Sequence, residues 1–212
     1  MRAGEPSGRG GVMKKVRLLL WLLVPVAAMG AFAAHQLSAS EGTTKGSLGQ
    51  VPHFSLTDQQ GRQVTDADLL GQVWVANFVF TRCPSVCPLL TAKFAALQKQ
   101  LGSLPVRFIS ISVDPEYDTP QVLAAYAARF EADANRWQFL TGPLADIERT
   151  VVQGFKIHRG DPTPSANDPT LVEIMHGEHF VLVDASGAIR GYYRSDSAGL
   201  KELEHDLRAQ LE

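Results

Sequence analysis

This sequence lacks an excess of basic residues. Its 20 Lys and Arg against 22 Asp and Glu give a formal net charge of −2. No polybasic surface is indicated, so nucleic-acid binding is excluded as a function. An internal repeat is also missing. The length of 212 residues, with 45% hydrophobic and 20% charged residues, suits one globular domain with an appendage.

Cysteine is scarce as well, since Cys83 and Cys87 are the only two in the chain. Residues 73–80 before them are apolar, β-branched and aromatic without alternation, which predicts a strand buried on both faces. Pro88 favours the first turn of a helix that continues to Leu101. We therefore expect Cys87 near a helix start, where unpaired backbone N–H groups and the helix dipole favour a thiolate.

Three residues separate the two cysteines, a spacing that lets their sulfur atoms either form a disulfide or bind one ion. A buried inert pair or a plain covalent staple is a third interpretation, which the rigid turn with Pro84 and Pro88 disfavours. A metal site that uses both thiolates needs at least one more ligand.

Charge is absent from residues 18–34, which follow the basic cluster Lys14, Lys15 and Arg17. Seventeen uncharged residues are at the short limit for a membrane-spanning helix. We expect an uncleaved anchor with residues 1–17 in the cytoplasm; a signal peptide with a small-residue cleavage site at 31–33 is the alternative. Either arrangement places the cysteines outside the cytoplasm.

Residues 35–50 are rich in Ser, Gly and Thr, which predicts a flexible linker, and residues 51–212 form the folded domain. Its first elements are a hairpin around 58–61 and a short helical turn at 66–70. After the cysteines we expect strands and helices in alternation: a strand at 106–113, a helix at 119–130, a strand at 137–140, a helix at 143–152, strands at 180–184 and 188–193, and a helix at 197–211.

This order predicts an α/β domain with a thioredoxin-like layout, in which a central mixed sheet is flanked by helices. It carries an N-terminal hairpin and one insertion at residues 158–170, where glycines and prolines predict an irregular excursion. Asp114 and Asp118 follow the strand at 106–113, and we interpret them as turn and capping residues, not as catalytic groups.

Six histidines are candidates for a third ligand. Four are surface residues or weak candidates: His35, His53, His158 and His205. His176 and His179 lie just before the strand at 180–184. In this layout that strand lies beside the strand at 73–80, so the loop before it can face the cysteines.

Three motifs resemble the Sco (SenC) family: Thr81-Arg-Cys83-Pro-Ser-Val-Cys87-Pro88, then Ser112-Val-Asp114-Pro-Glu-Tyr-Asp118-Thr119, then His176 eleven residues before the glycine of Val183-Asp184-Ala-Ser-Gly187. They occur in the family's order, and the similarity spans about residues 50–211. Members are membrane-anchored, thioredoxin-like copper proteins that help to assemble the copper centre of cytochrome c oxidase. The resemblance implies that Cys83, Cys87 and His176 are the copper ligands. Ser85 departs from the family, where many members carry Asp, and Met175 stands where some members have an acid.

The resemblance further implies a metallochaperone, not an enzyme, which delivers copper to the dinuclear copper centre of cytochrome c oxidase subunit II. Thiolates select Cu(I) and imidazole accepts Cu(I) or Cu(II), so this ligand set suits both oxidation states. Zinc would also accept these ligands together with a water, and His179 is the rival of His176. We expect the domain on the periplasmic face of the inner membrane. The thiols tend to oxidise there, so an extracytoplasmic thioredoxin-like reductant is expected as a second partner.

The alternative function is an extracytoplasmic thiol-disulfide oxidoreductase, with a redox disulfide between Cys83 and Cys87 as its product. Many reductases of this fold place a cis-proline opposite the dithiol, but no proline follows Pro169 in this chain. That absence, the three-residue spacing and the position of His176 weigh against a general reductase, whereas reduction of one specific target stays open. A copper or redox sensor would use the same residues and would differ only in its partner.

Overall fold

The computed structural model describes residues 46–84, 86–161, 163–164, 172–173 and 178–211, which belong to one compact unit. The expected cytoplasmic tail, the expected anchor at 18–34 and residues 35–45 of the expected linker lie outside the described residues, as do Ser85, Met175 and His176. The end of the expected linker belongs to the domain, because the N–H of Leu48 donates to the carbonyl of Ile189 and Gln50 pairs with Ala188. Within the described ranges, no helix is long and apolar enough to cross a membrane.

A seven-stranded mixed sheet forms the centre of the domain, in the order β2-β1-β5-β4-β3-β8-β9. Strands β3, β4 and β5 run parallel, and the strands on either side of these three pair antiparallel. The expected α/β class and the mixed sheet are therefore confirmed. The strands are β1 (Ser55–Asp58), β2 (Gln63–Thr65), β3 (Val73–Val79), β4 (Val106–Ser112), β5 (Trp137–Thr141), β8 (His179–Val183) and β9 (Ile189–Arg194).

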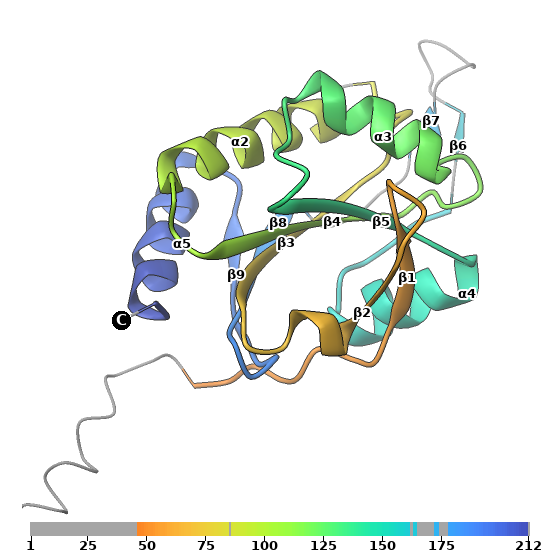
Figure 1. The fold of residues 1–212 in the computed structure, drawn as a ribbon. Helices are drawn as coiled ribbons and strands as arrows, with labels where there is room; N and C mark the ends of the chain where they lie inside the picture. Colours follow the sequence, from red (N-terminus) through yellow and green to blue (C-terminus); the bar gives the residue numbers. More distant parts are fainter. Residues whose placement is uncertain (1–45, 85, 162, 165–171, 174–177, 212) are drawn as a thin grey trace, which may run out of the picture. The chain divides into compact units, whose positions relative to one another are not determined.

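Helices cover both faces of this sheet (Figure 1). Helices α2 (Val86–Leu101), α3 (Pro120–Arg129) and α5 (Ser197–Ala209) share one core cluster with the sheet. The opposite face packs against α4 (Leu144–Ile147), its continuation η2 (Glu148–Gly154) and the short helix η1 (Asp66–Leu69).

Strand β3 contributes to both cores. Val73 and Val75 point to the cluster with α2, whereas Trp74, Ala76 and Phe78 join the cluster with η2. All seven residues of the strand are buried. The prediction of a strand covered on both faces is confirmed, and it places the strand's carboxyl end, with the cysteines, at one edge of a rigid sheet.

Two segments differ from the sequence-based expectation. The helix expected at 143–152 is a short α-helix that continues as a π-helix, and this wider turn places Phe155 against Trp74 and Phe78, at 6.0 Å and 5.5 Å between ring centroids. The excursion at 158–170 is also not wholly irregular, because β6 (Thr163–Pro164) pairs antiparallel with β7 (Val172–Glu173).

Gly199 marks a close contact between α5 and the end of β9. A Cβ atom at this position would overlap the backbone carbonyl oxygen of Arg194. We predict that Gly199→Ala lowers the free energy of unfolding by about 1–3 kcal/mol, as overpacking does, although alanine is intrinsically the better helix former by about 1 kcal/mol. Urea denaturation followed by tryptophan fluorescence measures the change. Gly46→Ala is the control, since no atom would contact its Cβ; an unchanged or higher stability for Gly199→Ala would contradict the packing argument.

Candidate metal and thiol site

The two cysteines lie in the turn between β3 and α2. The backbone N–H of Cys83 donates to the carbonyl of Phe80 at 3.3 Å, and Cys87 is the second residue of α2. No disulfide joins them. Cys83 is partly exposed, whereas Cys87 is fully buried. The pair therefore combines one partly exposed cysteine with one that lies in the core.

The helix start acts on Cys83 and not, as the sequence suggested, on Cys87. The backbone N–H of Cys87 donates to Sγ of Cys83 at 3.3 Å. The pKa of Cys87 is raised, first by the hydrogen bond between its thiol and Cys83 and then by burial. This raised pKa argues against the expected thiolate at Cys87, and the backbone N–H of Cys87 at the helix start stabilises negative charge on Cys83 instead.

The position of the last hairpin agrees with the sequence analysis. Strand β8 pairs antiparallel with β3, with Trp74 opposite Val183 and Ala76 opposite Val181. The first residue of β8, His179, is exposed and lies toward the end of β3 from which the cysteine turn departs. His176, the predicted third ligand, lies outside the described residues.

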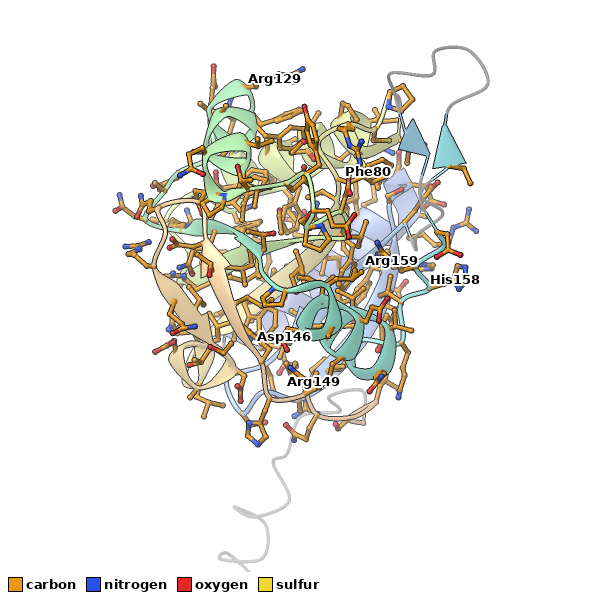
Figure 2. The ribbon with its side chains drawn as sticks, turned by 90° about the vertical axis from the view of Figure 1, so that its right-hand side faces the viewer. Phe80, Arg129, Asp146, Arg149, His158 and Arg159 are labelled. Atoms are coloured by element: carbon orange, nitrogen blue, oxygen red, sulfur yellow. The ribbon has the colours of Figure 1, made fainter. Side chains whose placement is uncertain are left out.

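The other described histidines give no additional ligand next to the cysteines. Figure 2 shows His158 at the outer edge of the molecule, whereas the adjacent Arg159 points inward. His53 contacts Asp66 at 2.8 Å, and His205 is exposed on α5. In the part of the chain that the structure describes, no three His, Cys, Asp or Glu side chains are grouped closely enough to hold a metal ion. The described part of the site is thus a dithiol.

A buried carboxylate fixes the turn that leads to Cys83. Asp118 is fully buried, and its oxygens accept hydrogen bonds from the backbone N–H and the hydroxyl of Thr81 and, at 2.6 Å, from the hydroxyl of Ser112. Burial raises the pKa of Asp118, and the hydrogen bonds from Ser112 and Thr81 oppose that rise. One side chain thereby joins the end of β4 to the start of the cysteine turn.

A second carboxylate holds the next residue. Asp114, with 2% of its side chain exposed, accepts hydrogen bonds from Nε and Nη2 of Arg82 at 2.9 Å and 2.7 Å. The guanidinium of Arg82 also lies 4.5 Å from the ring centroid of Tyr117. The two residues immediately before Cys83 are therefore each bonded to a different aspartate.

The capping interpretation of these aspartates is corrected by this geometry. Thr119 caps α3 by accepting from the backbone N–H of Val122, whereas both aspartate side chains point to the cysteine turn. Their backbones do form the turn, since the N–H of Asp118 donates to the carbonyl of Asp114 at 2.9 Å. Sequence reasoning missed Thr81 and Arg82 as positioning residues. The available signal was a pair of acids directly after a buried strand, because buried carboxylates require donors from a neighbouring segment.

Arg159 connects the insertion to the same edge of the sheet. Its side chain is 8% exposed, its Nε donates to the carbonyl of Val113 at 2.7 Å, and its Nη1 lies 3.9 Å from Glu148. The start of the excursion is thus tied to the residue before Asp114.

This arrangement suits soft-metal and thiol chemistry. Two adjacent sulfur atoms can donate to one ion or be oxidised to a disulfide, and one of the two cysteines, Cys83, is partly exposed. The aspartate contacts hold the turn in place by hydrogen bonds, which limits how far Cys83 can move when its state changes.

We predict that Asp118→Asn lowers the free energy of unfolding by about 1–3 kcal/mol, because an amide cannot accept all the hydrogen bonds that the buried carboxylate accepts. The same variant should increase the reaction rate of Cys83 with a thiol reagent, since the turn loses its attachment to β4. Chemical denaturation and reagent kinetics measure the two effects. Glu116→Gln, an exposed acid in the same loop, is the matched control and should stay within about 0.5 kcal/mol of the wild type. If the two variants have the same stability and the same rate of Cys83 modification, Asp118 does not position the cysteine turn.

Comparison with known proteins gives a consistent result. The SCO1/SenC family model matches residues 42–212. The SCO1 protein homolog of Bacillus subtilis (strain 168) is 36% identical over 164 residues, which cover 76% of this chain and 82% of that protein.

Two solved structures share the fold. The structure of Bradyrhizobium japonicum ScoI with copper bound is 27% identical with a TM-score of 0.66, over 76% of this chain and 99% of that chain. The second structure is that of BsSco, a member of the Sco family of cytochrome c oxidase assembly proteins in which a disulfide switch was identified. It is 32% identical with a TM-score of 0.68, over 80% of this chain and 98% of that chain. The chain, with its dithiol in the turn after β3, therefore belongs to the SCO1/SenC family.

Proposed function

We propose that this protein binds copper through Cys83, Cys87 and His176 and delivers it to the dinuclear copper centre of cytochrome c oxidase subunit II during oxidase assembly. The observation that carries the proposal is the pair of neighbouring cysteines at the end of β3, one of them partly exposed. Membership of the family and the copper-bound relative support the metal, and the description of BsSco as an oxidase assembly protein supports the process.

The donor set fits a transported ion. Cysteine thiolates favour Cu(I), and a histidine would extend the site to Cu(II). The partial exposure of Cys83 leaves one ligand within reach of an incoming partner ligand, which a closed structural metal site does not offer.

Residues 18–34 form the membrane anchor in this proposal, and residues 35–47 are the linker, since Leu48 and Gly49 already share backbone hydrogen bonds with Ile189 of the domain. The basic residues 1–17 would stay in the cytoplasm, which places the domain on the periplasmic face of the inner membrane. An oxidising compartment converts neighbouring thiols to a disulfide, so the loading cycle requires an extracytoplasmic thioredoxin-like reductant.

Thiol-disulfide exchange is the second candidate function, and the hydrogen bond from the Cys87 N–H to Sγ of Cys83 favours it. This contact stabilises the accessible sulfur as a thiolate, which is the attacking form. In the exchange, the Cys83 thiolate attacks a disulfide of the target, which releases one target thiolate and leaves a mixed disulfide. Cys87, after losing its proton, then displaces the second target thiolate, so the target disulfide is reduced and the Cys83–Cys87 disulfide is formed.

Copper titration of the reduced full-length chain tests the copper proposal. We predict tight binding of one copper ion per chain, with the absorption bands of a thiolate complex when Cu(II) is used. Cys83→Ser, Cys87→Ser and His176→Ala should each weaken binding by at least about tenfold, because loss of one ligand removes more than about 1.4 kcal/mol. His179→Ala is the matched control and should bind as the wild type does.

If His179→Ala weakens binding and His176→Ala does not, the third ligand is His179. If the wild type binds copper no better than the cysteine variants but exchanges its disulfide readily with a partner thiol, the copper proposal is wrong and the oxidoreductase is adopted.

A further inference from the structure

A polar cavity of about 380 Å³ lies at the end of the sheet opposite to the cysteines. Arg107 and Gln138 are each the second residue of their strands, β4 and β5, whose carboxyl ends point to the cysteine edge. Amide, guanidinium and carboxylate groups line the cavity, chiefly those of Arg62, Asp68, Gln72, Arg107, Asn135 and Gln138.

Two arginines line this cavity, Arg62 and Arg107. Among the described residues, no carboxylate forms an ion pair with Arg107. Its Nη2 donates to Oε1 of Gln138 at 2.8 Å, but its Nε is buried and has no hydrogen-bond partner among the described residues. The neighbouring Arg62 is already paired with the buried Asp58, at 2.8 Å and 2.7 Å from Nε and Nη2. Arg107 also lines the cavity, so a charge that no described carboxylate balances faces this space, and an oxyanion is the natural partner for it.

Asp68 supplies the opposite charge in the same cavity. Its Oδ2 accepts from the backbone N–H and the hydroxyl of Thr65, and these hydrogen bonds lower the pKa of Asp68. It therefore remains ionised at neutral pH and would repel a simple anion. With Arg62 neutralised by Asp58, the lining presents one positive and one negative group, which matches a ligand that carries both charges.

The chain enters the domain at the same end of the sheet. Leu48 and Val51 donate backbone hydrogen bonds to Ile189 and Gly187, next to the turn between β8 and β9, and Gly71 before β3 donates to Ala185 in that turn. Leu48 and Leu70 are exposed here by 61% and 54%. Residues 1–45, which include the uncharged run, precede this entry point.

We propose that this cavity binds a zwitterionic phosphate compound of the phosphoethanolamine class, with the phosphate at Arg107 and the ammonium at Asp68. The headgroup of an ethanolamine phospholipid and free phosphoethanolamine share this chemistry. Only the lipid source rests on the membrane anchor of the proposed function, and the exposed leucines beside the entry point favour it.

The test follows the Nε–Hε signal of Arg107 by NMR in the full-length chain labelled at arginine, with Arg107→Lys used to assign the signal. O-phosphoethanolamine should shift this signal in a saturable manner. Arg107→Gln should weaken binding by about tenfold or more, as the loss of a charge-assisted hydrogen bond does. Asp68→Asn should weaken phosphoethanolamine binding by up to about fivefold and leave or improve the binding of inorganic phosphate. Arg149→Gln is the control and should change the binding of neither compound, because Arg149 forms an exposed ion pair with Asp146 and does not line the cavity.

The lipid source is examined in nanodiscs of phosphatidylethanolamine, phosphatidylcholine or phosphatidylglycerol. A shift of the Arg107 signal only with phosphatidylethanolamine supports the headgroup, since the choline ammonium cannot donate a hydrogen bond and glycerol carries no cation. Binding of free phosphoethanolamine without a nanodisc effect supports the site with a soluble ligand. If phosphoethanolamine does not shift the Arg107 signal, the proposal is wrong. It is also wrong if inorganic phosphate binds as tightly as phosphoethanolamine and Asp68→Asn changes neither affinity. Copper binding at the cysteines is measured separately, so a negative result for one proposal does not affect the test of the other.

Discussion

The hydrogen bonds between Asp118 and Thr81 join two segments that lie 37 residues apart in the sequence. Because the carboxylate is fully buried, these bonds cannot be replaced by water without a large cost. The ion pair between Asp114 and Arg82 adds a second attachment one residue further along. The cysteine turn thus takes its position from the loop after β4 as much as from its own strand and helix.

The parallel pairing of β3 and β4 makes this attachment possible. The two strands run side by side from Val73 opposite Val106 to Val79 opposite Ser112, so their carboxyl ends reach the same edge together. The N–H of Val113 continues the pairing by donating to the carbonyl of Val79 at 2.9 Å. Chemistry at this edge is therefore supported by a sheet that is buried on both faces, while the opposite edge holds the polar cavity with Arg107.

Much of this arrangement could be predicted from residue patterns. The apolar run at 73–80 identified a doubly covered strand because burial on both faces requires apolar side chains throughout, and the flanking prolines marked the cysteine turn. The π-helical turn before Phe155 was not predictable, since it depends on how that ring packs against Trp74 and Phe78. The hydrogen-bond partners of Asp114 and Asp118 were not predicted, for the same reason. Their donors come from a distant segment, and a local pattern of acids and prolines cannot distinguish a cap from a tertiary contact. The raised pKa of Cys87 likewise follows from its hydrogen bond with Cys83 and from burial, neither of which its position in the sequence shows.

The unequal exposure of the two sulfur atoms imposes an order on any exchange with a partner. Cys83 is partly exposed, whereas Cys87 is completely covered by the core, so an incoming ligand or thiol meets Cys83 first. The pKa of Cys87 is also raised above that of an ordinary thiol, by its hydrogen bond with Cys83 and by burial, so this thiol releases its proton less readily than a free cysteine does. For the proposed copper exchange, this difference in exposure implies two successive steps, in which the bond to Cys83 changes before the bond to Cys87. The direction of approach is fixed by the fold itself, because a fully covered Cys87 leaves a partner only the side on which Cys83 is exposed.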